Sequence, residues 1–123
     1  MKTLLAYCQK DGISPFLQFV SENEKVGQKL LQGVSCLASF PEFEKAPHSK
    51  YFSIAPYKGL YEFRVRIKVP VRTIYIKRDD QIILLHPFVK RHERNLIQAL
   101  DKSLQYLIEL RESEDQAILL KEL

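Results

Sequence analysis

The stretch 57–91, YKGLYEFRVRIKVPVRTIYIKRDDQIILLHPFVKR, decides the fold, because it holds three consecutive runs rich in Val, Ile, Tyr and Phe. These residue types favour β-strands, and turn residues separate the runs. In the first run, 60–68, Tyr61 and Phe63 alternate with Glu62 and Arg64. This period of two predicts a strand with one apolar face and one charged face.

The second and third runs predict two more strands. The second, 71–77, follows Pro70, which is tolerated at the start of a strand but removes a hydrogen bond from the middle of a sheet. The third, 81–88, follows the turn pair Asp79-Asp80, and its IILL segment is apolar at every position. A strand that is apolar on both faces is typical of the centre of a covered sheet. We therefore expect an antiparallel sheet connected by hairpins.

The segment before this stretch predicts a short strand and two helices. The strand is TLLAY at 3–7, and the first helix begins with Ser14 as N-cap and Pro15 at its first position. A second helix over 24–38 has apolar residues at helical spacing. Its two glycines are either weak points or sites of close packing. The helices are predicted to form a hairpin on the apolar face of the sheet, followed by a loop with a short strand at 51–54.

The segment after the stretch predicts a C-terminal helix. A basic turn at 90–94 precedes an apolar stripe at helical spacing over 95–110, with Asn95 as its N-cap. Residues 112–123 form either a helical extension or a tail, whose apolar side chains contact a partner or fold onto this chain's own core. The sequence as a whole predicts one α+β domain over 1–123.

Composition excludes several classes of protein. The chain has 123 residues and 46% hydrophobic content, enough for one domain with a real core. Cys8 and Cys36 are its only cysteines and have no metal-ligand spacing, so we expect neither a metal site nor disulfides. The glycines have no phosphate-loop or dinucleotide spacing, which predicts no cofactor. The apolar run in MKTLLAYCQK is too short for a signal peptide and no segment is long enough to span a membrane, so we expect a soluble, cytoplasmic protein.

Positive charge gathers on the predicted sheet. Residues 50–94 hold eleven Lys and Arg but four Asp and Glu, a net charge of +7, whereas the rest of the chain has a net charge of −3. A basic sheet in an acidic frame indicates a phosphate-bearing or acidic partner. The alternative is a solvated sheet face whose cations discourage pairing between edge strands.

The phrases KGLYEFRVR, VRTIYI and IILLHPFVKR, in this order and spacing, resemble the RelE/ParE superfamily of small toxins, and within it the HigB-like, phage-derived branch. The resemblance covers nearly the whole chain and is densest over 59–91. It implies a RelE-like antiparallel sheet with an N-terminal helical hairpin on one face and a C-terminal helix. It also implies the toxin of a type II toxin–antitoxin system: an endoribonuclease that cleaves mRNA on the translating ribosome and so inhibits translation.

The resemblance also implies site residues. The arginine of the family's L-Y-E-L-R phrase falls on Arg64, that of Y-R-I-L-Y on Arg72, the histidine of L-L-H on His86, and the first lysine of the last phrase on Lys90. The chain departs from the pattern at Val71, where the family has an aromatic residue. Arg91 replaces the second lysine of the last phrase, and Lys50 or Lys58 is the nearest counterpart of an upstream lysine.

The chemistry of RNA cleavage points to the same residues. Without a metal ion, the substrate's 2′-OH is the nucleophile, and the protein supplies proton transfer and cations for the phosphate. Arg64 and Arg66 share one strand face and can bind one phosphate, whereas Arg72 groups with apolar residues unless a bulge near Pro70 turns it. His86 is either catalytic or structural. The remaining cations predicted to bind the RNA backbone are Lys50, Lys58, Arg91 and Arg94.

Two other functions fit the same resemblance. One is a gyrase-inhibiting poison of the ParE branch, and the other is an inactive remnant that binds only its antitoxin and DNA. In every case a cognate antitoxin protein is the expected partner, held in a hetero-oligomer on the basic face or the sheet edge.

Overall fold

The computed structural model of the chain describes residues 1–65, 67–113 and 116–120. Its helices and strands follow one another in this order: β1 (Thr3–Tyr7), α1 (Pro15–Glu22), α2 (Glu24–Ser39), the short 3₁₀ helix η1 (Pro41–Glu44), β2 (Ser49–Tyr51), β3 (Tyr61–Val65), β4 (Val71–Arg78), β5 (Gln81–Val89), α3 (Glu93–Glu112) and β6 (Ala117–Leu119). The predicted α+β class is confirmed.

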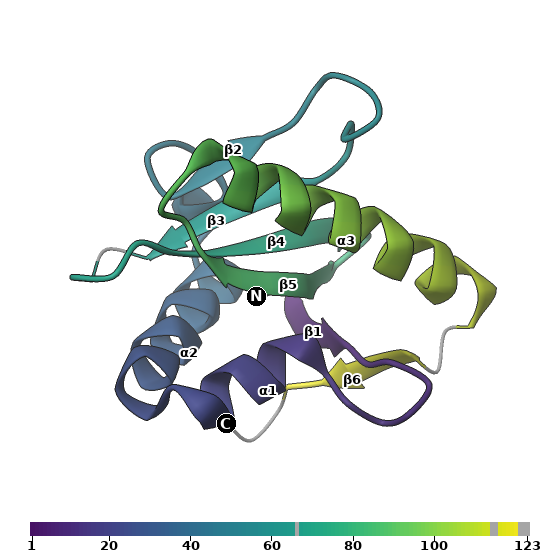
Figure 1. Cartoon of the computed structure of the whole chain (residues 1–123), viewed down its shortest axis with the longest axis horizontal. Helices are drawn as coiled ribbons and strands as arrows, with labels where there is room; N and C mark the ends of the chain where they lie inside the picture. The colour runs from purple at the N-terminus through teal and green to yellow at the C-terminus, as the bar shows by residue number, and fades with distance from the viewer. Residues whose placement is uncertain (66, 114–115, 121–123) are drawn as a thin grey trace.

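The six strands form one mixed sheet in the order β2-β3-β4-β5-β1-β6 (Figure 1). Strands β3 to β5 pair antiparallel, as predicted. Strand β2 pairs antiparallel with β3 and lies at 49–51 instead of the predicted 51–54. Strand β1 pairs parallel with β5, so the prediction of a purely antiparallel sheet is wrong at this position. The reason is the path of the chain: α1 and α2 carry it from β1 across the sheet to β2 at the far edge, which leaves β1 beside β5.

Strand β5 lies inside the sheet and is covered on both faces, as its apolar IILL segment predicts. Ile82 and Leu84 pack toward α1 and α2, whereas Ile83 and Leu85 pack toward α3. All four side chains are fully buried. The helical hairpin and the C-terminal helix therefore lie on opposite faces of the sheet (Figure 1).

The helical hairpin begins as its sequence predicts. Pro15 stands at the first helical position, and the Ser14 hydroxyl accepts a hydrogen bond from the backbone N–H of Leu17 at 3.4 Å. Gly27 of α2 is buried against α1. A Cβ at Gly27 would lie 2.6 Å from the backbone oxygen of Val20, so this glycine is a site of close packing.

On the opposite face, α3 begins earlier than predicted. Its N-cap is His92, and Asn95 occupies the third helical position instead of the predicted cap. The Asn95 Oδ1 accepts hydrogen bonds from the backbone N–H groups of Arg91 at 3.0 Å and His92 at 2.8 Å. Farther along, Tyr106 stacks on Tyr7 of β1 with 4.5 Å between ring centroids, which fixes the helix to the sheet.

The C-terminal segment turns back onto the sheet. Helix α3 ends at Glu112, and residues 117–119 form the edge strand β6, antiparallel to β1, instead of a helical extension. Of the two alternatives for its apolar residues, the described part of this segment packs on this chain's own core, since Ala117 contacts the cluster beneath α3.

A β-bulge in β5 decides which side chains share a face. Ile74 of β4 pairs with His86, but its neighbour Tyr75 pairs with Leu84, so Leu85 is the extra residue. The extra residue reverses the alternation beyond it. His86 therefore points to the same face as Ile74 and Ile83, where regular alternation would have turned it toward α1 and α2.

Gly27→Ala is expected to destabilise the fold. The new methyl group would press on the Val20 backbone, and such overpacking costs about 1–3 kcal/mol, only partly offset by the better helix propensity of alanine. Urea denaturation measures the change, with the exposed neighbour Gln28→Ala as the control variant. Equal stability of the two variants would contradict the close contact between α1 and α2.

Candidate functional site

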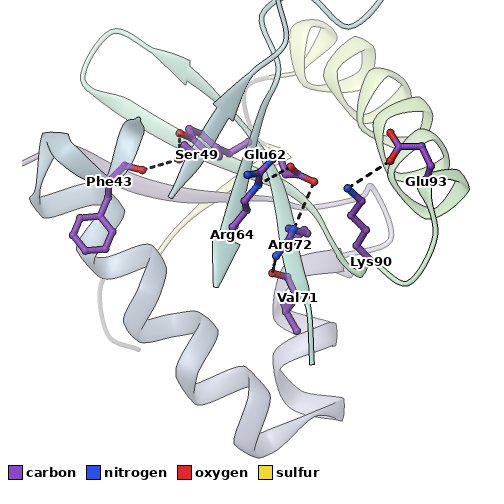
Figure 2. Close-up of polar contacts among 9 residues, drawn as sticks. Phe43, Ser49, Glu62, Arg64, Val71, Arg72, Lys90 and Glu93 are labelled. Carbon is purple, nitrogen blue, oxygen red and sulfur yellow. Dashed lines mark hydrogen bonds and ion pairs between the residues drawn. The ribbon is translucent and has the colours of Figure 1, made fainter. Parts of the chain in front are cut away.

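A buried carboxylate lies between two arginines at the centre of the site. Glu62 of β3 is fully buried, and its Oε1 accepts a hydrogen bond from Nε of Arg64 at 3.1 Å. Its Oε2 lies 3.8 Å from Nε of Arg72 on the neighbouring strand β4. Figure 2 shows both guanidinium groups directed at this one carboxylate.

Strand pairing brings the three side chains together. Glu62 and Arg64 are two residues apart and so share one face of β3, and Arg64 pairs directly with Arg72 across the strands. Arg72 lies on the face of Ile74 and Ile76, as simple alternation predicts, without a bulge near Pro70. Because the two arginines stand side by side, the negative charge of Glu62 offsets the repulsion between them.

The arrangement leaves both guanidinium groups able to bind a ligand. Both contacts with Glu62 use Nε. Arg72 Nη1 also donates to the Val71 carbonyl at 3.5 Å, whereas no hydrogen bond within the described residues occupies Arg72 Nη2 or the terminal nitrogens of Arg64. The side chains of Arg64 and Arg72 are 36% and 21% exposed. Glu62 Oε2 and Arg72 Nε have no hydrogen-bond partner within the described residues. A rigid pair of forks beside solvent suits bidentate contact with a phosphate group.

Lys90 adds a third cation next to this pair. Its backbone N–H donates to the carbonyl of Pro70 at 2.8 Å, which fixes the end of β5 beside the start of β4. Its Nζ lies 3.5 Å from Oε2 of Glu93, in the first turn of α3. The Glu93 side chain is 73% exposed. Figure 2 shows Lys90 between Arg72 and Glu93. An exposed ion pair of this kind is weak, so Lys90 can exchange Glu93 for a ligand.

Of the other predicted cations, some lie beside the arginines and one lies apart. Lys50 pairs with Glu62 across β2 and β3, so it extends the same face toward the sheet edge, where its Nζ lies 5.4 Å above the Phe52 ring. Arg91 and Arg94 are exposed beside the start of α3. Lys58 lies apart, in a different pocket near the end of β4. Arg66 lies outside the described residues.

His86 is on the same face as the arginines but beneath α3. Its ring centroid is 5.9 Å from that of Tyr106, and its Nδ1 has no hydrogen-bond partner within the described residues. Burial, with the positive charge of Lys102, lowers the pKa of His86 from 6.5 to about 4. The imidazole is therefore neutral at physiological pH.

Two tyrosines of the sheet have structural positions. Tyr75 is fully buried on the opposite face of the sheet, and its hydroxyl donates to Ser49 Oγ at 2.9 Å. Ser49 Oγ in turn donates to the carbonyl of Phe43 at 2.7 Å (Figure 2). The Tyr61 ring stacks on Tyr75 at 5.0 Å between centroids. These contacts fix β2 and η1 to the core.

Glu62 is the site residue that the sequence analysis missed. Alternation placed it on the charged face with Arg64, but a single acidic residue there is also what a solvated strand would carry. The sequence did contain one signal for this role: Glu62 stands two residues before Arg64, so both side chains lie on the same face of the strand, the face that the C-terminal helix partly covers. Burial, which only the fold provides, makes it a structural anion for two arginines.

No family model, curated protein or solved structure matches the chain. Among the described residues, no group of three or more His, Cys, Asp and Glu side chains is placed to hold a metal ion. Nor does this part of the chain contain a helix long and apolar enough to cross a membrane. The candidate functional site is the group formed by Glu62, Arg64, Arg72 and Lys90, which we name the arginine cluster.

Glu62→Gln is expected to lower the free energy of unfolding by about 2 kcal/mol. The change keeps the shape of the side chain but leaves Arg64 and Arg72 adjacent without a counter-charge; their partial exposure keeps the loss below that of a fully buried pair. Urea denaturation measures the free energy of unfolding of this variant and of the control Glu93→Gln. The control breaks an exposed ion pair and is expected to cost less than about 0.5 kcal/mol. Similar losses for the two variants would contradict a central role for Glu62.

Lowering the pH from 7 to 5 is expected to cost about 2 kcal/mol of stability through His86. The pKa is about 4 in the folded protein and near 6.5 when unfolded, so the unfolded chain binds the proton first. The contribution is present above pH 6.5 and is lost as the pH falls toward 4. Urea unfolding at both pH values should show a smaller pH effect in His86→Leu than in the wild type or in the exposed-histidine control His92→Gln. An unchanged pH effect in His86→Leu would show that His86 is not buried in its neutral form.

Proposed function

We propose that this chain is a toxin of a type II toxin–antitoxin system and an endoribonuclease that cleaves mRNA without a metal ion. The observation that carries the proposal is the pair of partly exposed arginines oriented by a buried carboxylate. The α+β arrangement also supports it, with a helical hairpin on one sheet face, a C-terminal helix on the other, and the three sequence phrases falling largely on β3, β4 and β5.

In this proposal the arginine cluster binds the scissile phosphate. Arg64 and Arg72 contact its non-bridging oxygens through their terminal nitrogens and stabilise the charge that develops as the 2′-OH attacks. The attack forms a 2′,3′-cyclic phosphate and breaks the P–O5′ bond, and the leaving 5′ oxygen takes its proton from water. Glu62 positions both guanidinium groups, so little reorganisation is needed when RNA binds. Lys90 contacts an adjacent phosphate after leaving Glu93.

The outer cations extend the path of the RNA. Lys50 lies toward the sheet edge, whereas Arg91 and Arg94 lie beside the start of α3, so a single strand crossing the cluster has backbone contacts on both sides. Such contacts carry no base preference. Selection of mRNA is therefore assigned to the translating ribosome, which presents the strand in single-stranded form.

His86 enters the proposal as the proton acceptor. A neutral imidazole can accept a proton from the 2′-OH, and the negative charge of a bound phosphate would raise its pKa toward the physiological range. Because His86 lies beneath α3, this role requires the substrate to approach along the start of that helix. Its replacement would slow cleavage more than it weakens RNA binding.

The partner in this proposal is an antitoxin protein in the same cytoplasm. Acidic side chains of the antitoxin would neutralise the arginine cluster and compete directly with RNA. The resulting complex is a hetero-oligomer in which the toxin is inactive.

Induced expression in a bacterium tests the ribonuclease. The wild-type chain is expected to arrest growth and to produce new 5′ ends in translated transcripts. Arg64→Gln and Arg72→Lys should reduce the cleavage rate roughly 100-fold, because one loses the charge and the other loses the planar fork. Lys29→Gln removes an exposed cation of α2 and serves as the control variant with full activity.

Thermal unfolding of each purified variant separates loss of activity from loss of fold. Full activity in a folded Arg64→Gln or Arg72→Lys variant would remove the arginine cluster from the mechanism. Growth arrest with intact transcripts and damaged DNA would indicate a gyrase poison instead. Expression without arrest would indicate an inactive remnant.

A further inference from the structure

A cationic pocket, which we name the second cationic pocket, lies at the end of β4 away from the arginine cluster and includes Lys58. Its volume is about 300 Å³. Three elements supply its cations: Lys58 comes from the loop between β2 and β3, Arg78 from β4 and Arg111 from α3. Its apolar lining consists of Ile76, Leu107 and Leu110.

The charge of this pocket is not neutralised by its own lining. None of its lining residues, all within the described ranges, is Asp or Glu. Lys77, which also borders the pocket, is paired with Glu44 at 2.9 Å. Arg78 donates to the neutral amide oxygen of Gln81 from Nε at 3.4 Å and Nη2 at 3.3 Å, so its orientation is set while its charge remains. Lys58 and Arg111 are exposed.

Local contacts hold the three elements around the pocket. The Tyr57 hydroxyl donates to Asp101 of α3 at 2.7 Å, which fixes the loop next to Lys58 against the helix. Ile76 and Leu110 belong to the core beneath α3. The apolar floor of the pocket is therefore part of the folded core, and the side chains of Lys58 and Arg111 are exposed at its rim.

The pocket is separate from the arginine cluster. Arg72 and Arg78 lie on the same face of β4, six residues apart, which corresponds to roughly 20 Å along the strand. One phosphate cannot contact both. Lys90 lies beside the first turn of α3, whereas Arg111 lies in its last turn, so α3 runs from one site to the other.

We propose that this pocket binds a nucleotide, with its phosphate on Lys58, Arg78 and Arg111 and its base against Leu107, the partly exposed apolar side chain of the lining. Three cations in a pocket whose described lining holds no acidic residue match a phosphate group better than a single carboxylate. The volume is at the lower end for small-molecule sites and suits one nucleotide rather than a peptide helix. A free nucleotide and one nucleotide unit of an RNA strand share this chemistry.

Titration of the ¹⁵N-labelled full chain with AMP tests this site without requiring RNA cleavage. The backbone amides of Gly59, Lys77 and Arg111 should shift in a saturable way, whereas those of Arg64 and Arg72 report the arginine cluster separately. Arg111→Gln is expected to weaken binding at the pocket roughly tenfold, because a charge-assisted hydrogen bond is lost. The control Lys102→Gln removes an exposed cation of the same helix outside the pocket and should leave affinity within about twofold of the wild type.

The outcomes distinguish the pocket from the proposed ribonuclease. Saturable shifts at the pocket in a chain that cuts no RNA would support the site and refute only the ribonuclease. A short oligoadenylate that binds the pocket much more tightly than AMP assigns it to RNA, and equal affinity assigns it to a free nucleotide. Absence of shifts at the three amides, an unaffected Arg111→Gln variant, or tighter binding of tetraglutamate than of AMP would overturn the proposal.

Discussion

The structure depends on the burial of β5 from both sides. Four consecutive apolar residues, Ile82 to Leu85, alternate between two faces and require cover on each. The α1–α2 hairpin covers one face and α3 covers the other. Because the middle of the sheet is taken up by this packing, charged side chains gather where the cover ends: the arginine cluster near the first turn of α3 and the second cationic pocket near its last turn.

The arginine cluster shows how a small fold holds like charges together. Arg64 and Arg72 are directly opposite on adjacent strands, a pairing that is unfavourable unless an anion intervenes. Glu62 supplies that anion from within the core, and its own burial is compensated by a hydrogen bond from Arg64 and an ion pair with Arg72. A solvent-exposed carboxylate would be screened by water and would compete with a ligand phosphate for the guanidinium groups. The buried Glu62 carboxylate contacts them from the core side instead.

Much of the fold was predictable because local patterns carry it. The strands of the central hairpins, the start of α1 at Ser14 and Pro15, and the double-sided character of β5 follow from alternation, capping and apolar runs, which are properties of neighbouring residues. The parallel partner of β1 and the strand β6 were not predicted, since pairing between distant segments depends on chain path. Asn95 was predicted as the N-cap of α3 because asparagine is common at that position. From the third helical position its side chain also accepts backbone hydrogen bonds at the start of the helix, and the sequence does not distinguish the two positions.

The sequence by itself determined which residue types were available to the site: a basic sheet, Arg64 and Arg72 on two strands, and a histidine at the end of a third. Only the tertiary structure decided which of them meet. Strand register placed Arg64 opposite Arg72, burial turned Glu62 into their common anion, and the bulge at Leu85 moved His86 to their face. The same structure separated Lys58 from the cluster by the length of β4. Alternation and charge are local quantities, whereas register, burial and bulges arise from long-range packing, which is why the second set required the fold.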